Sequence, residues 1–148
     1  MNTARFSDYL ATGVYVPAAD SASFSPAEYV AEFRKHFGYR DDYWPKKDYA
    51  KVRDSIAGEC AMRAPHDTAA REINGDAVML LVMSGDPEGV EAGKNLGDCM
   101  MKNEDDKETL LERMSEAFKA LSSLAVKQDE QARQSVAQDA AIERYLRI

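Results

Sequence analysis

The sequence has little of the chemistry that marks most enzymes and metalloproteins. Its 148 residues include only two cysteines, Cys60 and Cys99, and two histidines, His36 and His66. It contains no CxxC, HExxH, GxSxG or glycine-rich phosphate-loop motif, so neither a zinc site nor an activated nucleophile is indicated. Two cysteines are also too few for a disulfide framework and are typical of a reducing compartment. We therefore expect a protein that is not an enzyme, with no catalytic residues, no metal and no cofactor.

Long hydrophobic runs are also missing. The longest, from Ala77 to Met83, has seven residues, whereas a membrane-spanning helix needs about 20. The first ten residues, MNTARFSDYL, lack the apolar region of a secretory signal. With 45% apolar and 30% charged residues, the composition is that of an ordinary globular protein. We expect a cytoplasmic protein, in a host cytoplasm or a virion if its source is viral, with no membrane partner.

The second half of the chain is poor in aromatic residues. Eleven of the thirteen lie within the first 49 positions, and only Phe118 and Tyr145 lie beyond. Five of them share the window 34–53 with seven Lys or Arg residues and three Asp residues. Such residues dominate protein–protein hot spots and can also stack on bases, although they equally suit a helical corner with core aromatics and solvated lysines. The candidate binding residues, which we call the basic–aromatic corner, are Arg40, Tyr43, Trp44, Lys46, Lys47 and Tyr49.

Positive charge is scarce overall, because the formal net charge is −7. The whole deficit lies in residues 66–148, which carry ten basic and seventeen acidic side chains, and it is densest over 86–116. Nucleic-acid binding needs an excess of Lys and Arg to neutralise phosphates. The charge balance therefore favours a protein partner over nucleic acid.

Capping signals predict the first helices. The run Ser25-Pro26-Ala27-Glu28 combines an N-cap oxygen, a proline in the first turn and a capping-box glutamate, and Gly38 ends this helix. A short helix from Thr3 and an extended segment at 13–17 are predicted to precede it. A further helix is predicted from about Lys47 to Met62.

The segment around Asn74-Gly75 leaves the fold class open. A short helix from Asp67 or Thr68 is predicted to end there, because Asn-Gly is a turn dipeptide. Residues 77–83 then suit either a buried strand or a core helix, and we favour a helix because no second strand is evident to pair with it. The prediction is a mainly α, compact helical bundle of five to seven helices with a long C-terminal helix. The alternative is an α+β fold with one or two short strands near 13–17 and 77–83.

Three glycines recur at every fourth position of a helix that begins at Asp86-Pro87. Residues four apart lie on one helix face, and each glycine costs about 1 kcal/mol relative to alanine in a helix. The face therefore packs closely against another helix, within the chain or across a dimer, or else the segment is a loose helix. For the dimer case the candidate interface residues are Gly89, Gly93 and Gly97.

The last part of the chain contains neither proline nor glycine, so nothing interrupts a long helix from about Asp106. Its apolar stripe runs for about four turns and thins over 127–139. We predict a compact body of residues 1–126 and a C-terminal arm of residues 127–148, whose tip packs on its own core, on a second copy or on another protein. The candidate interface residues at the tip are Ile142, Tyr145 and Leu146.

These patterns predict a non-catalytic assembly or adaptor protein that acts through protein–protein contacts. Its partner would be a second copy, giving a homo-oligomer, or a larger protein, as in an accessory or structural protein of a phage or bacterium. One alternative is a nucleic-acid-binding protein that uses the basic–aromatic segment 34–53. Another is an acidic inhibitor that mimics nucleic acid.

Overall fold

A computed structural model describes residues 24–46, 48–102 and 106–146 of the chain. These ranges contain five α-helices and no strand, so the predicted helical bundle with a long C-terminal helix is confirmed. The helix predicted from Thr3 and the extended segment at 13–17 lie outside the described residues. The helices are α2 (Pro26–Phe37), α3 (Tyr49–Met62), α4 (Thr68–Val82), α5 (Pro87–Met101) and α6 (Lys107–Leu146).

Local signals in the sequence set the ends of several helices. The Ser25 side chain accepts a hydrogen bond from the Glu28 N–H (3.3 Å), and Gly38 ends α2 in the left-handed conformation with φ of 69°. Asp48 and Asp86 cap α3 and α5 in the same way as Ser25 caps α2. Each side-chain oxygen satisfies a backbone N–H that has no partner inside its helix.

Helix α4 corrects the sequence prediction. It runs without a break through Asn74-Gly75, so the predicted turn is wrong, and residues 77–82 are helical rather than a strand. The Tyr39 side chain explains the glycine, because a Cβ atom at Gly75 would lie 2.0 Å from the Tyr39 hydroxyl oxygen. Gly75 therefore makes room for a neighbouring ring, and burial of the apolar run that follows keeps the helix continuous.

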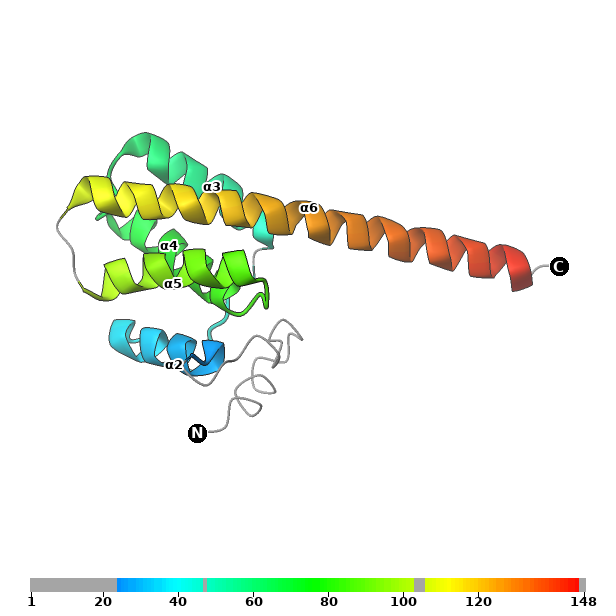
Figure 1. Cartoon of the computed structure of the whole chain (residues 1–148), viewed down its shortest axis with the longest axis horizontal. Helices are drawn as coiled ribbons and strands as arrows, with labels where there is room; N and C mark the ends of the chain where they lie inside the picture. Colours follow the sequence, from blue (N-terminus) through cyan, green and yellow to red (C-terminus); the bar gives the residue numbers. More distant parts are fainter. Residues whose placement is uncertain (1–23, 47, 103–105, 147–148) are drawn as a thin grey trace.

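The bundle is arranged around α4. Helix α6 lies along α3 and α5, and α4 packs against α2, α3, α5 and α6 (Figure 1). Helix α2 packs across α4 and α5. A helix with neighbours on so many sides is apolar around most of its circumference, and every residue from Asn74 to Met83 is buried.

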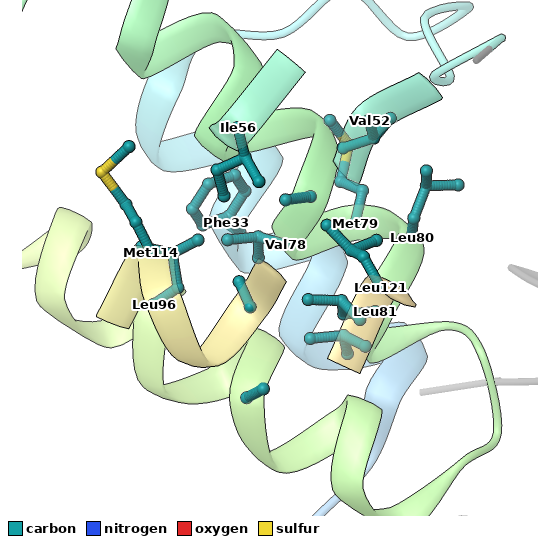
Figure 2. Close-up of a cluster of buried hydrophobic side chains, with 14 of the residues drawn as sticks. Phe33, Val52, Ile56, Val78, Met79, Leu80, Leu81, Leu96, Met114 and Leu121 are labelled. Carbon is teal, nitrogen blue, oxygen red and sulfur yellow. The ribbon is translucent and has the colours of Figure 1, made fainter. Parts of the chain in front are cut away.

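The core contains side chains from all five helices (Figure 2). Helix α6 contributes its apolar stripe to this core, as the sequence predicted. Aliphatic and methionine side chains predominate, and the largest fully buried ones are Phe33, Ile56, Met79, Leu81, Met83, Leu96, Met114 and Leu121.

Helix α6 continues well past the bundle (Figure 1). Its last buried residue is Ala125, and every residue from Val126 to Leu146 is exposed. The division of the chain into a body of 1–126 and an arm of 127–148 stays a prediction. Among the described residues, none of the helices combines the length and the hydropathy that crossing a lipid bilayer requires.

Candidate functional site

The basic–aromatic corner is held in place by a buried arginine that the sequence analysis did not single out. Arg34 is only 6% exposed, and its guanidinium donates hydrogen bonds to the main-chain carbonyls of Arg40 and Tyr43. It also lies 5.8 Å from the centre of the Tyr39 ring. A buried cation needs such partners, so Arg34 ties the turn at 40–43 to α2. The signal in the sequence was its position one turn after Val30, on the apolar face of α2.

A pair of stacked tyrosines forms the exposed side of this corner. The rings of Tyr39 and Tyr43 lie 5.4 Å apart, and the Tyr43 hydroxyl donates to Asp76 Oδ1 over 2.5 Å. Burial raises the pKa of Tyr39 to about 12, with the Asp76 carboxylate adding to the shift. Burial and the hydrogen bond to Asp76 also raise the pKa of Tyr43.

The other aromatic candidates serve mainly in packing. Trp44 and Tyr49 are half-buried and pack against the core, whereas Arg40 and Lys46 are exposed. Lys47 lies outside the described residues. A hollow of about 430 Å³ beside Trp44 is lined by two carboxylates, Asp42 and Asp76, as well as by basic side chains. The corner therefore offers one exposed ring, that of Tyr43, together with charges of both signs.

The glycine face of α5 packs inside the chain. A Cβ atom at Gly93 would lie 2.8 Å from the Leu81 Cβ atom, and one at Gly97 would lie 2.4 Å from the Tyr29 hydroxyl oxygen. A Cβ atom at Gly89 would lie 2.9 Å from the Oγ atom of Ser84, which precedes α5. Helix α5 thus approaches α4 and α2 closely, and all three glycines are buried. This is the packing within the chain that the sequence analysis considered beside a dimer.

Ion pairs engage several carboxylates of the acidic stretch 86–116. Lys127 lies 3.1 Å from Asp86, and Lys94 lies 3.2 Å from Asp98. Glu108 pairs with Arg63, and Glu116 pairs with Arg113. Carboxylates that already have cationic partners are poorly suited to imitate a row of phosphates.

The arm carries two uncharged rows that continue from the buried face of α6. Leu121 and Leu124 are buried. Residues spaced by multiples of seven from each of them form one seam where a helix supercoils around a partner, because the supercoil removes the drift of about 20° per heptad that a straight helix has. The seven charged residues between 127 and 146 all lie off these rows. Large apolar side chains reappear at the end, where Ile142 is 56% exposed and Tyr145 is 77% exposed. The continued rows, which we call the arm seam, are Gln128, Gln131, Ser135, Gln138, Ile142 and Tyr145.

A separate cavity brings together residues that the sequence analysis treated singly. His36, His66 and Cys99 all line a cavity of about 670 Å³, and fully buried Asn74 lines it as well. Among residues 24–46, 48–102 and 106–146, no group of three or more His, Cys, Asp or Glu side chains is arranged to hold a metal ion. Asn74 was missed because the sequence predicted a turn at its position.

Comparison with protein-family models, with curated proteins and with solved structures found no match to this chain.

Proposed function

We propose that this chain is a non-catalytic assembly protein that associates with a second copy of itself through the C-terminal arm. The observation that carries the proposal is the arm seam, which extends from buried Leu121 and Leu124 at seven-residue spacing into a segment exposed on all sides. The apolar end of this face, at Ile142 and Tyr145, is exposed, and clustered exposed apolar side chains are typical of contact sites between proteins.

The composition of the arm seam suits pairing between helices. Its middle consists of glutamine and serine, whose side chains can hydrogen-bond across an interface, and its end is apolar. Charged residues flank these rows, as they do at the edges of coiled coils, where they select the partner and its orientation. Polar layers inside a seam lower stability but define the register. Such an arm would form a specific and reversible interface.

The length of the arm is consistent with this role. Residues 127–146 extend about 30 Å at 1.5 Å per residue. Most helices in proteins gain their stability from packing of an amphipathic face, and residues 126–146 bury no side chain in this structure. A second copy that covers Ile142, Tyr145 and Leu146 would supply that packing.

Light scattering coupled to size-exclusion chromatography tests the proposal. The full chain should have the molar mass of an oligomer, and deletion of residues 127–148 should leave a folded protein with the mass of one chain. An oligomer whose mass is unchanged by the deletion would place the interface elsewhere. A monomeric full chain would contradict self-association and favour a larger partner protein.

Two exposed positions of the arm provide a matched pair of variants. Ile142→Lys puts a charge on the arm seam, whereas Val136→Lys puts the same charge on another side of the helix, and the two native side chains are 56% and 68% exposed. We expect Ile142→Lys to dissociate the oligomer and Val136→Lys to leave its mass unchanged. Equal effects of the two variants would show that the seam does not define the interface.

The two nucleic-acid alternatives have less support. Binding through the basic–aromatic corner would need free aromatic faces, but Trp44 and Tyr49 pack against the core. Mimicry of nucleic acid would need a row of free carboxylates, but ion pairs with Asp86, Asp98, Glu108 and Glu116 interrupt the acidic stretch. A flat fluorescence titration of Trp44 with single-stranded DNA and RNA at low salt would exclude binding through the corner.

A further inference from the structure

The cavity lined by both histidines of the chain is large enough to hold a small molecule. Its volume of about 670 Å³ lies within the range of roughly 300–1,000 Å³ that is common for ligand pockets. Residues of α2, α4, α5, the α3–α4 connection and the start of α6 line it. The residues on which the inference depends are His36, Phe37, His66, Arg71, Asn74 and Met100.

Asn74 supplies the strongest indication of a ligand. Its side chain is fully buried, yet neither Nδ2 nor Oδ1 has a hydrogen-bond partner among the described residues. Buried polar atoms in folded proteins are nearly always paired, because an unpaired one retains the full cost of losing water. A leucine of similar size would avoid this cost, so the amide points to a group that pairs with it when bound.

An amide presents one donor and one acceptor side by side. The complementary partner therefore carries an adjacent acceptor and donor in one plane. A nucleobase edge has this arrangement, and asparagine pairs with adenine through its N6 and N7 atoms in this way.

The remaining lining suits a flat ring with an attached anion. The half-buried Phe37 ring offers an aromatic surface, with the His36 imidazole 4.6 Å away, and Met100 adds a polarizable thioether that packs well on rings. His36, His66 and Arg71 are exposed at the rim. Their N–H groups are the donors that a phosphate group requires, and Arg71 adds a permanent positive charge.

From this arrangement we infer that the cavity binds a purine mononucleotide, with the base edge at Asn74 and the phosphate at Arg71. Solvent does not reach Asn74, so the base reaches the amide by displacing a neighbouring side chain. Met100 and Met101 are the most flexible apolar side chains of the lining and would move most easily. The inference does not depend on the arm, so it stands or falls separately from the proposed self-association.

Calorimetric titration of the full chain with three probes tests the inference. Adenosine 5′-monophosphate contains both the base and the phosphate, adenosine lacks the phosphate, and inorganic phosphate lacks the base. We expect the monophosphate to bind at least about tenfold more tightly than adenosine, because adenosine cannot make the charge-assisted contacts at the rim. Inorganic phosphate alone should not bind. If none of the probes binds at millimolar concentration, the inference is wrong. Equal affinity for inorganic phosphate and the monophosphate would show that the base does not contribute to binding and would also overturn the inference.

Variants at two positions assign the contacts. Asn74→Leu should weaken monophosphate binding at least about tenfold and raise the melting temperature of the free protein, since the unpaired amide is gone. Asn95→Leu, the same change outside the cavity on α5, should leave binding unchanged. Unaltered binding by Asn74→Leu would refute the role of the amide.

Arg71→Gln provides a second test, because Arg71 is exposed and its loss should not affect folding. It should weaken binding of the monophosphate and leave that of adenosine unaffected. Equal losses for the two probes would contradict the placement of the phosphate at the rim.

Discussion

The two halves of α6 contrast within one uninterrupted helix. Residues 107–125 bury seven side chains against α3, α4 and α5, whereas residues 126–146 bury none. Both halves are rich in residues that favour helices, so intrinsic propensity does not distinguish them. The first half is stabilised by burial of apolar surface and the second by weaker local interactions, such as the exposed pair Arg133–Asp129. A continuous helix therefore need not be uniformly stable.

The boundary between the halves coincides with an ion pair. Lys127 contacts Asp86 over 3.1 Å, one turn after the last leucine that packs into the core. Asp86 also accepts a hydrogen bond from the Gly89 N–H (2.9 Å) at the start of α5. This single carboxylate thus joins the beginning of α5 to the point where α6 leaves the bundle.

Truncation of one large side chain in each half should give the largest difference. Leu121→Ala should lower the free energy of unfolding by about 2–5 kcal/mol, because it leaves a cavity in the core. Ile142→Ala should change it by no more than about 0.5 kcal/mol at a protein concentration where the chain is monomeric. Urea unfolding followed by the fluorescence of Trp44, which packs against the core, measures both. Similar losses in the two variants would show that the arm is part of the cooperative unit.

Glycine substitutions should separate close packing from open helix surface within the bundle. Gly93→Ala should lower the free energy of unfolding by about 1–3 kcal/mol, since its Cβ would lie 2.8 Å from Leu81 Cβ and 3.0 Å from the Val82 nitrogen. Gly58→Ala on α3, where a Cβ meets nothing within 4 Å, should raise it by up to about 1 kcal/mol. The same urea titration compares them. A stabilised Gly93→Ala variant would contradict the described approach of α5 to α4.

Acid should weaken the junction between the halves. Burial acts to raise the pKa of the Asp86 carboxyl, but the Gly89 N–H and Lys127 outweigh it, so the pKa lies below its ordinary value. The folded state therefore binds this proton less readily than the unfolded state. The stabilisation is present above the ordinary pKa of about 3.9 and is lost as the pH falls through the lower pKa of the folded state.

Asp86→Asn retains a good N-cap but removes this charge. We expect it to lower the free energy of unfolding by about 0.5–1 kcal/mol at neutral pH. The difference from the native chain should shrink at about pH 3, as measured by urea unfolding at both pH values. A difference that does not depend on pH would show that the charge contributes nothing.

The smallest effect is expected in the arm itself. Arg133→Gln removes the pair with Asp129, in which the two side chains are 78% and 61% exposed. Such a pair contributes about 0.3–0.5 kcal/mol, so amide hydrogen exchange in the arm should accelerate by about twofold. Arg133→Lys retains the pair and should leave the exchange rates unchanged. Equal acceleration in both variants would show that the ion pair is not the cause.

Much of the fold could be predicted because the signals were local. The Ser25 cap, the Gly38 ending and the start of α5 at Asp86-Pro87 depend on residues within one helical turn of each other. The sequence also indicated the stripe of α6 that is buried in the structure. Less of the candidate site could be predicted. Asp76 gains its role from a residue distant in the sequence and Asn74 from a cavity, and the role of Arg34 depends on how the turn at 40–43 folds back onto α2.

By itself, the sequence determined that the protein is helical, that Ser25 and Asp86 cap two of its helices and which face of the first half of α6 is apolar. These properties depend on short-range hydrogen bonds and on residue spacing. Only the tertiary structure decided that Asn74-Gly75 continues a helix, because Tyr39 occupies the space beside Gly75 and burial outweighs the local turn preference. It also decided that the glycines of α5 pack within the chain, since spacing defines a face but not the helix that covers it.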